Sequence, residues 1–427
     1  MKTRHAASTV GATPRFPEIE GRTLARVLRL NRSDRRTAPM PRSARIVLGM
    51  LGGIEHGRLE ILLPDATTRH FGSGPVTASM RLNNWNVFDA TLRHGDIGFA
   101  ESFIAGDWDT DALHDVLGLL VGNRRAFDDA VYGSWWGNLA HRLRHLLNRN
   151  SRAGSRRNIH AHYDLGNAFY RLWLDPGMTY SSAIFDDEPE RTLEQAQDAK
   201  YRRVLDELSL PAGARVLEIG CGWGGFAHAA ARDGLHVRGL TLSTEQLALA
   251  RERLGEAGLS TQTQFALQDY RDERDRHDGI VSIEMFEAVG EAYWPTYFET
   301  LARTLRTGGR AVIQTITIDE ALFQRYRTGT DFIQQYVFPG GMLPSKQAFE
   351  AAAEAAGLRV ANRFDFGQDY ARTLALWRQR FLARLPEVEA LGFDARFVRT
   401  WEFYLDYCEA AFRHRNCDVV QYTLTHR

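Results

Sequence analysis

The sequence predicts an α/β protein built on a doubly wound, largely parallel sheet, preceded by a smaller N-terminal α/β domain. Three observations support this fold class. Short apolar segments alternate with helical stretches from residue 215 onward, which is the pattern of strand–helix–strand units. A glycine-rich turn follows the first of these segments. At 427 residues the chain is too long for one compact core, so two domains are expected.

The first strand of the sheet is predicted at residues 215–219, a mostly apolar segment typical of a buried parallel strand. Glycines follow at positions 220, 222, 224 and 225, and a helical run covers residues 226–232. Glycine lets the backbone approach a ligand closely and adopt dihedral angles that a Cβ forbids. The strand, the turn and the helix together predict a nucleotide-type pocket.

The residues around this turn favour S-adenosylmethionine (SAM) over NAD. Gly220, Gly222 and Gly225 fit the dinucleotide pattern G-x-G-x-x-G, but NAD sites carry an acid at the end of the second strand. Here the second strand, residues 236–240, is followed by Thr241-Leu242-Ser243. Glu218, two residues before the first glycine, matches the E/D-x-G-x-G loop of SAM methyltransferases. A tight turn without a ligand is disfavoured because four glycines in six positions are costly for a turn alone.

The remaining elements follow in alternation. A helix is predicted at 243–256, and strands are predicted at 262–267, 279–283 and 310–316. Ligands of such sheets bind beyond the carboxyl ends of the strands. One crevice is therefore expected to be lined by Glu218, Gly220, Thr241, Asp269, Glu284, Glu287 and Gln314.

The N-terminal part of the chain is basic. Residues 1–50 hold eleven Lys and Arg against three acids, a balance of +8 in a chain whose net charge is zero. We predict a basic tail over residues 1–40 that contacts an anionic surface, a membrane rather than a nucleic acid; a solvated tail is the alternative. A small lipid-docking domain is predicted over 41–140, with strands at 58–63 and 78–84.

A basic linker is predicted over 141–160, since residues 141–157 contain six arginines and no acid. It could also touch anionic lipid. The catalytic domain is predicted over 161–427. Three cysteines, Cys221, Cys408 and Cys417, form neither a disulfide framework nor a metal-binding spacing. No signal peptide or spanning segment is visible, so a cytoplasmic protein without a metal is expected.

Six stretches resemble the cyclopropane-fatty-acyl-phospholipid synthase family, which includes the mycolic acid cyclopropane synthases. They are residues 162–167, 178–183, 216–226, 286–290, 336–344 and 370–374. Residues 106–108 are similar to the extra N-terminal domain of the bacterial phospholipid enzymes. The resemblance implies a class I SAM-methyltransferase fold, Rossmann-like, acting at the inner face of the membrane. It also implies that the cis double bond of a phospholipid acyl chain attacks the SAM methyl group, and that a base then removes a proton from the resulting cation so that a cyclopropane closes. A homodimer is a further expectation.

The resemblance also implies site residues. The residues expected to line SAM are Tyr180, Ser181, Gly220, Gly222, Thr241, Gln246, Gln268 and Asp269, together with Glu218, Gly224 and Leu242 of the same loops. The family holds bicarbonate as the base, and its pocket falls on Ser182, Glu287, Gln314, Ile316 and Tyr370. Positions 182 and 314 depart from the family, which usually has Cys and His there. A further cysteine of the family falls on Cys408, for which a catalytic role competes with that of a buried small hydrophobe.

Three alternatives to cyclopropane formation stay open at this point. The departures at positions 182 and 314 suggest that the same methyl transfer could end in a methylene- or methyl-branched acyl chain. A methyltransferase for a small soluble substrate is the second alternative. A SAM- or lipid-binding protein without catalysis is the third, and the retention of Glu287 and Tyr370 argues against it.

Overall fold

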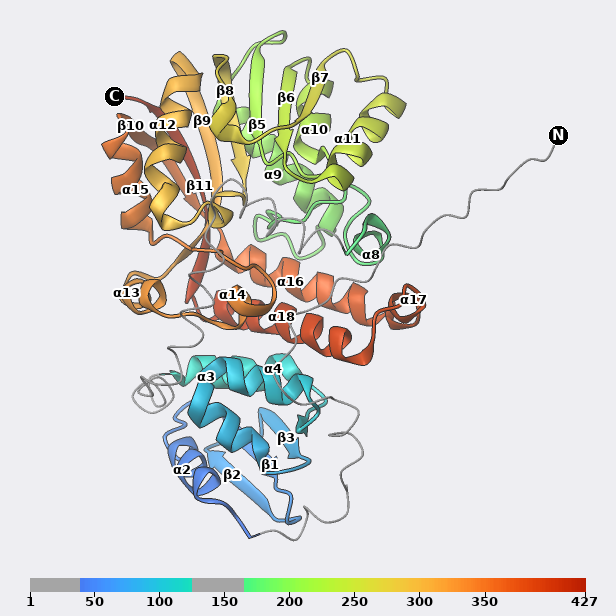
Figure 1. Cartoon of the computed structure of the whole chain (residues 1–427), viewed down its shortest axis with the longest axis vertical. Coiled ribbons are helices and arrows are strands. Elements are labelled where there is room, and N and C mark those ends of the chain that lie inside the picture. Colours follow the sequence, from blue (N-terminus) through green and yellow to red (C-terminus); the bar gives the residue numbers. More distant parts are fainter. Residues whose placement is uncertain (1–38, 125–164) are drawn as a thin grey trace, which may run out of the picture.

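The computed structural model describes residues 39–124 and 165–427. Two sheets with their helices form a larger upper part and a smaller lower part in Figure 1. The predicted basic tail up to residue 38, the basic segment 141–157 and residues 162–164 of the first family stretch lie outside the described residues. No helix in the described ranges is both long enough and apolar enough to cross a bilayer.

The larger sheet has seven strands within residues 165–427, in the order β10-β11-β9-β8-β5-β6-β7. Five strands run parallel: β5 (Arg215–Ile219), β6 (His236–Thr241), β7 (Thr263–Leu267), β8 (His277–Ile283) and β9 (Leu305–Ile318). All five were predicted, within a few residues at their ends. β10 (Leu358–Asp365) and β11 (Cys417–His426) extend the sheet and were not predicted, and β11 runs antiparallel to both of its neighbours.

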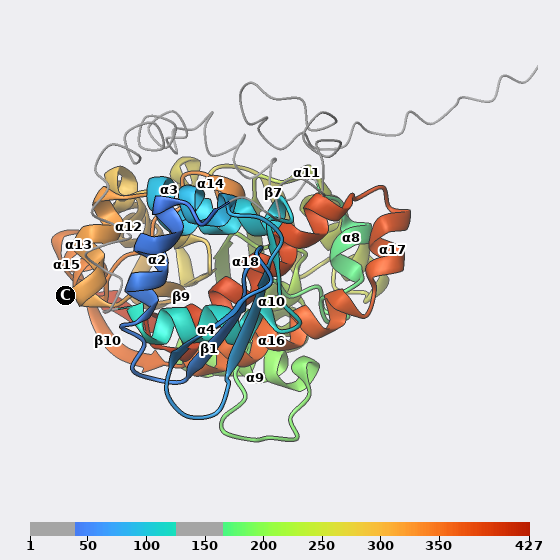
Figure 2. The same ribbon diagram turned by 90° about the horizontal axis from the view of Figure 1, so that it is seen from below.

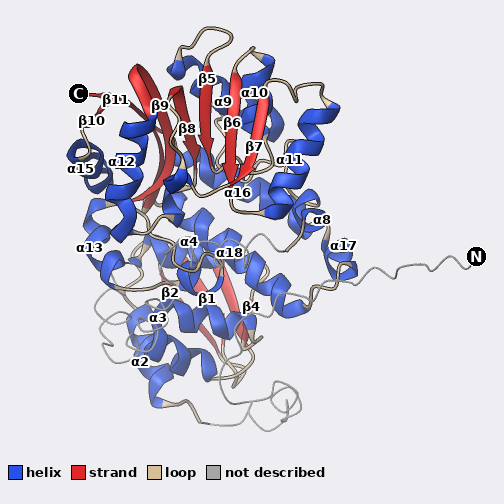
Figure 3. Ribbon diagram, turned by 45° about the horizontal axis from the view of Figure 1, so that its top comes forward, coloured by secondary structure: helices blue, strands red, loops and turns tan. Residues whose placement is uncertain are grey.

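Helices cover both faces of this sheet, as Figure 3 shows, because its central strands are apolar on both sides. Val216 packs with α9 (Leu193–Leu208), α10 (Gly225–Arg232) and α11 (Thr244–Glu256) on one face. Leu217, the next residue of β5, packs with α12 (Trp294–Thr304) and α15 (Lys346–Ala355) on the other. This is the doubly wound arrangement that the sequence predicts.

A layer of helices lies between the two sheets in Figure 1. Its long members are α16 (Gly367–Leu382) and α18 (Ala395–Arg413), joined through α17 (Leu385–Ala390). The short helices are α8 (Asn167–Arg171), α13 (Glu320–Thr328) and α14 (Phe332–Tyr336). Their shared core is aromatic, with Trp173, Trp377 and Trp401 all nearly inaccessible to solvent.

The N-terminal α/β domain has the strand order β2-β1-β3-β4. Its strands are β1 (Arg58–Leu62), β2 (Thr68–Gly72), β3 (Ala78–Leu82) and β4 (Trp108–Asp109), and its helices are α2 (Arg42–Leu51), α3 (Asn86–Ile104) and α4 (Leu113–Gly122). β1 and β3 lie at the positions predicted for strands, whereas β2 was not predicted. Seen from below in Figure 2, α3 and α4 lie against α18 of the catalytic domain.

Polar contacts join the two domains along α18. Arg399 donates hydrogen bonds to the carbonyl oxygens of Phe103 (2.7 Å) and Trp108 (2.9 Å) and to Asp109 (2.9 Å). The Tyr407 hydroxyl donates to Asp96 at 3.1 Å. The N-terminal domain is thereby held against the helical layer that lies beneath the catalytic sheet.

Candidate active site

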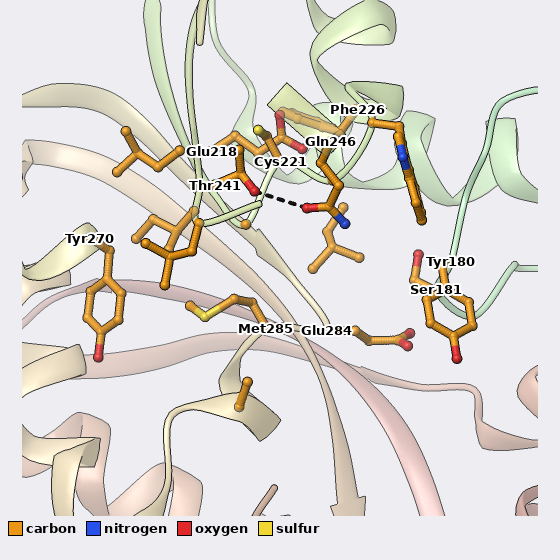
Figure 4. Close-up of a pocket in the computed structure, with 18 of the residues that line it drawn as sticks. Tyr180, Ser181, Glu218, Cys221, Phe226, Thr241, Gln246, Tyr270, Glu284 and Met285 are labelled. Atoms are coloured by element: carbon orange, nitrogen blue, oxygen red, sulfur yellow. Dashed lines mark hydrogen bonds between the residues drawn. The ribbon is translucent and has the colours of Figure 1, made fainter. Parts of the chain in front are cut away.

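A pocket opens at the carboxyl ends of β5, β6 and β8 and is closed on one side by residues 178–181 (Figure 4). Its floor is the predicted glycine turn. Gly220 and Gly222 have φ angles of 82° and 49°, which glycine adopts without strain. A Cβ at Gly222 would meet no atom of the described chain within 4 Å, so this position faces open pocket space.

Most residues predicted to line SAM meet in this pocket. The predicted residues on its wall are Tyr180, Ser181, Glu218, Gly220, Gly222, Thr241, Leu242, Gln246, Gln268 and Asp269. Gly224 is different: it is not among the pocket residues of the described chain, and a Cβ there would meet Leu254 and Ala250 of α11 at 3.1 and 3.3 Å. Gly224 therefore serves the close packing of α10 and α11, and its contact with SAM stays a prediction.

Local structure fixes the polar side chains at the strand ends. Thr241 donates to Gln246 Oε1 at 2.9 Å, the contact dashed in Figure 4. The Ser243 side chain caps α11 by accepting from the Gln246 backbone N–H. Asp269 is held in an ion pair with Arg271 at 2.6 Å. Two short turns thus present carbonyl, hydroxyl and amide groups to one side of the pocket.

Glu218 indicates that the pocket suits a ligand with positive charge. Its side chain is buried, and its Oε2 atom has no hydrogen-bond partner among the described residues. Burial raises the pKa of Glu218 well above its ordinary value, and the nearby Lys200 opposes this effect. A buried carboxylate oxygen without a partner is costly unless a ligand satisfies it. The ammonium and sulfonium charges of SAM would do so, and the residues present therefore fit this cofactor.

Lys200 is a site residue that the sequence analysis missed. It is fully buried on α9, and its Nζ donates to Ser181 Oγ at 2.6 Å. Burial lowers the pKa of Lys200, while the carboxylates of Glu284, Asp175 and Glu218 oppose that effect. The sequence does hold a signal for it, because a lysine lies on the buried stripe of an amphipathic helix, together with Leu193, Ala196, Gln197 and Val204.

Glu284 lies at the centre of the group that was predicted to hold bicarbonate. Its Oε1 accepts from the backbone N–H of Ser182 at 2.8 Å and from Gln314 Nε2 at 2.7 Å. The Tyr370 hydroxyl hydrogen-bonds to the same carboxylate. Burial raises the pKa of Glu284, and Lys200 is the largest opposing influence. Three of the predicted bicarbonate residues therefore converge on a carboxylate of the protein itself.

The backbone of Glu284 is strained. Its φ angle of 47° lies in the left-handed region, which glycine favours and glutamate rarely adopts. Such strain costs of order 1–3 kcal/mol and persists where the surroundings hold it, often at functional sites. In Figure 4 the Glu284 side chain points toward Tyr180 and Ser181. This conformation carries its carboxylate into the pocket wall at the end of β8.

Glu287 lies behind Glu284. Its Oε1 accepts from the backbone N–H of Ile316 and from Thr315 Oγ1 at 2.9 Å, while its Oε2 has no partner among the described residues. Burial, reinforced by the negative charge of Glu284, raises the pKa of Glu287 to about 8. Two buried carboxylates next to one another favour a single shared negative charge.

The crevice prediction needs a correction at two positions. Glu218, Gly220, Thr241, Asp269 and Glu284 line the pocket, but Glu287 and Gln314 do not line it within the described residues. Both lie one layer deeper, and Gln314 is fully buried. Ser182 and Tyr370 reach the pocket wall through Glu284, whereas the backbone N–H of Ile316 contacts Glu287.

Cys408 lies on α18 and packs against the aromatic core. Burial raises the pKa of its thiol well above the ordinary value, so the reactive thiolate is disfavoured. This environment fits the small hydrophobe better than the catalytic group. Over residues 39–124 and 165–427, no set of three or more His, Cys, Asp or Glu side chains is arranged to hold a metal ion.

Comparisons with known proteins agree with this geometry. The family model of mycolic acid cyclopropane synthetase matches residues 150–422. The chain is 43% identical to the tuberculostearic acid methyltransferase UfaA1 of Mycobacterium tuberculosis, over 78% of this chain and 79% of the relative. It is 36% identical to the cyclopropane-fatty-acyl-phospholipid synthase of Escherichia coli K12, over 82% of this chain and 88% of the relative.

A solved structure of the mycolic acid cyclopropane synthase CmaA1, complexed with SAH and CTAB, superposes with a TM-score of 0.59 and 32% identity. The match covers 63% of this chain and 97% of that one. A SAM-derived ligand is thus bound by a protein that shares the fold described above. The chain belongs to the mycolic acid cyclopropane synthetase family and is a SAM-dependent methyltransferase of lipid chains.

Proposed function

We propose that this enzyme transfers the SAM methyl group to the cis double bond of an unsaturated acyl chain in a membrane phospholipid, and that a cyclopropane is the product. The observation that carries this proposal is the buried carboxylate of Glu284 at the pocket wall. Three donors, from Ser182, Gln314 and Tyr370, converge on it. Ring closure needs a base that removes a proton from the newly added methyl group, and Glu284 supplies a carboxylate at the pocket wall for this step.

The cofactor and the alkene need precise alignment, because an alkene is a poor nucleophile. When bound, SAM supplies an electrophilic methyl group. The glycine turn and Glu218 would hold the cofactor, and Ser181, fixed by Lys200, would orient it from the other side. The π electrons of the alkene would form the new carbon–carbon bond while the methyl–sulfur bond breaks and S-adenosylhomocysteine leaves, and a positive charge would develop on the neighbouring chain carbon.

Aromatic rings next to the pocket would protect this cation. Tyr180, on the pocket wall, lies 5.3 Å from Trp377 and 5.5 Å from Trp173 between ring centroids, and its hydroxyl is 2.8 Å from that of Tyr404. Such rings exclude water and present electron-rich faces to a positive charge.

A base must then take one proton from the added methyl group, and the electrons of that C–H bond close the ring. Glu284 is placed for this step, since it is the pocket-wall carboxylate that the donors of Ser182, Gln314 and Tyr370 orient. Bicarbonate, which the family resemblance implies, would have to displace Glu284 from the donors of Ser182, Gln314 and Tyr370. We therefore propose Glu284 as the base, with Glu287 behind it and Tyr370 holding it in place.

A methylene-branched acyl chain is the second candidate product. It is favoured by the occupation of the predicted bicarbonate donors by Glu284, and by the 43% identity to a relative named for tuberculostearic acid. A hydride shift along the chain followed by proton loss from the added methyl group gives the methylene, and no further reactant is needed. A saturated methyl branch would require a separate hydride donor.

The test uses the full chain, vesicles of dioleoyl phosphatidylglycerol and SAM with a deuterated methyl group. Both candidate products keep two of the three deuterium atoms, and NMR of the extracted lipid separates a ring CD₂ from a vinylidene carbon. Dipalmitoyl vesicles, which lack a double bond, are the control and should stay unlabelled. Labelled lipid from dipalmitoyl vesicles, or none from dioleoyl vesicles, would overturn the proposal. Turnover that depends on added bicarbonate would overturn the role of Glu284 alone.

We also propose that the enzyme works while bound peripherally to an anionic membrane on its cytoplasmic side. The basic segments that support this lie mostly outside the described residues, although Arg42 and Arg45 belong to α2. Each arginine near an anionic surface contributes about 1 kcal/mol at low salt. Co-sedimentation with the same vesicles should therefore fall steeply as salt rises. Salt-independent binding would contradict the proposed attraction to anionic lipid. The expected homodimer stays a prediction.

A further inference from the structure

A second cavity lies between the two domains, away from the cofactor pocket. Its volume is about 640 Å³, within the range of about 300–1,000 Å³ that is typical of ligand sites. The N-terminal domain contributes Met80, Leu117 and Leu120 to its wall, and α18 contributes Phe403, Tyr407 and Ala411. Protein interiors hold few voids larger than a water molecule, so a mostly apolar cavity of this size calls for an occupant.

The chemistry of the wall points to an apolar chain. The wall is formed mainly by aliphatic and aromatic side chains from both domains. Each buried CH₂ group strengthens binding about fourfold, so even part of an acyl chain would bind well here. A soluble polar metabolite would find few partners on such a surface.

Charged groups in the cavity favour an anionic head. Arg93, Arg124 and Arg325 are part of its lining. Arg124 and Arg325 are half-buried and interact within the protein, whereas Arg93 is exposed. The cavity also contains the acids Asp96 and Asp331. Asp96 accepts from Tyr407 and Asp331 caps α14 by accepting from the Gln334 N–H at 2.8 Å, so both carboxylates are engaged within the protein. Arginine suits phosphate, which it can contact through two parallel hydrogen bonds.

A wall of side chains separates this cavity from the cofactor pocket. Phe403 faces the cavity and packs edge-on against the fully buried Phe332 at 4.8 Å. Tyr404, the next residue of α18, faces the other way and contacts Tyr180 of the cofactor pocket. A chain in the cavity therefore cannot present its double bond to the methyl group of SAM.

We propose that the interdomain cavity binds one acyl chain of an anionic phospholipid, with the phosphate at Arg93, and that this chain is not the one that is methylated. The site would hold the enzyme on the membrane lipid while a different chain enters the catalytic pocket. The inference goes beyond the proposed function and can fail independently of it.

The test is photo-crosslinking of the full chain with vesicles of a phosphatidylglycerol that carries a diazirine in a saturated acyl chain. We expect labelled peptides from residues 113–122 and 403–411. Ala411→Trp would fill the cavity from α18 and displace at least two methylene groups of the acyl chain. Labelling should therefore fall about tenfold. Ala395→Trp, at the exposed first position of the same helix, is the matched control and should label like the natural protein.

Binding of S-adenosylhomocysteine by calorimetry shows whether Ala411→Trp is folded, and Val121→Trp fills the same cavity from the α4 side if it is not. Equal labelling of 113–122 in the filled variant would overturn the inference, as would labelling confined to peptides of the catalytic pocket. Loss of cavity labelling in the filled variant supports the lipid-binding inference. This holds even if the lipid assay shows no methyl transfer and so contradicts the proposed function.

Discussion

At the scale of single residues, the site is defined by one strained glutamate. Glu284 has a left-handed backbone, and its carboxylate collects donors from three separate segments of the chain. These donors orient the carboxylate, while Lys200 supplies a compensating positive charge. The proposed role of Glu284 as the base gives the first of three tests at this scale.

Glu284→Gln should lower lipid methylation by a factor of about 10²–10⁴, the usual contribution of a general base. The amide keeps the shape of the side chain but cannot take a proton. Affinity for S-adenosylhomocysteine should change little, because the glycine turn and Glu218 remain. Glu291→Gln, which removes an exposed carboxylate paired with Arg327, is the control. Full ring formation in the Glu284 variant would mean that another base completes the reaction.

Gly222→Leu should abolish cofactor binding in calorimetry. A side chain at this position enters open pocket space, where the ligand and the leucine would compete for the same volume. Gly213→Leu is the matched control, since Gly213 also has a positive φ (85°) with open space at its Cβ but lies on an exposed turn. Equal loss in both variants would indicate backbone strain rather than occlusion of the pocket.

Glu287 should make stability depend on pH. Its pKa of about 8 in the folded protein lies above the ordinary value of 4.5, so the native state holds a proton that the unfolded chain releases. The unfolding free energy gained from this group is complete at low pH. It should fall by about 1.4 kcal/mol per pH unit as pH rises from about 5 to about 8.

Urea unfolding of the natural protein and Glu287→Gln across this range measures the effect, because the variant lacks the titrating group. The difference in unfolding free energy between the natural protein and the variant should shrink or reverse as pH rises. Parallel pH profiles would show that Glu287 titrates normally.

Sequence analysis predicted most residues of the pocket wall, but it placed Glu287 and Gln314 on the wall instead of behind it. Glycines and strand ends identify a pocket directly, since their positions along the chain fix where they lie on the sheet. Whether a carboxylate faces the pocket or lies behind it depends on backbone dihedrals, as at Glu284, and no local pattern encodes these. Lys200 was missed for a similar reason, because a lysine on a helix is usually solvated.

At the scale of elements, helix α9 joins the cofactor pocket to the domain core. Its N-terminus is closed by a capping box in which Thr192 accepts from the Gln195 N–H and the Gln195 side chain accepts from the Thr192 N–H. Eight residues into the helix, Lys200 contacts Ser181. Fraying of the N-terminal end of α9 would therefore loosen Lys200 and, through it, Ser181 on the pocket wall.

Thr192→Ala should lower the unfolding free energy by about 1 kcal/mol, the usual cost of removing a capping side chain. Thr192→Ser keeps the acceptor oxygen and should lie close to the natural protein. Urea unfolding measures the difference. If the serine and alanine variants were equally destabilised, the lost methyl group rather than the cap would be responsible.

The elements that escaped prediction are those whose stability depends on partners far along the chain. β5 to β9 are short apolar runs between turns and could be predicted from their own residues. β11 carries Gln421 and Thr423 in buried positions, where Gln421 bonds to Gln314 and Thr423 bonds to Glu207 of α9. These polar residues break the apolar pattern of a buried strand, and only the assembled sheet satisfies them.

At the scale of the whole molecule, Arg399 joins the two domains through several polar contacts. Its guanidinium bonds to Asp109 and to two carbonyl oxygens, and it stacks 3.9 Å from the centre of the Phe103 ring. A partly buried charged group with several partners contributes about 1.5–3 kcal/mol. One side chain of α18 therefore accounts for much of the polar contact between the domains.

Arg399→Ala should weaken the attachment of the N-terminal domain. Hydrogen exchange of residues 99–109 should rise, while exchange of the β5–β8 strands should stay unchanged, because the catalytic sheet has its own core. Arg384→Ala, which removes an exposed pair with Glu387 at the start of α17, is the control and should change neither region. Unchanged exchange in 99–109 would show that apolar contacts alone hold the domains together.

The position of β11 has a consequence for synthesis of the chain on the ribosome. This strand lies inside the sheet, between β10 and β9, yet it is made after every other strand. Until it emerges, Gln314 lacks its partner Gln421 and β10 has no neighbour to pair with. The donors around Glu284 can therefore be complete only once β11 has emerged from the ribosome, later than every other strand of the described sheets.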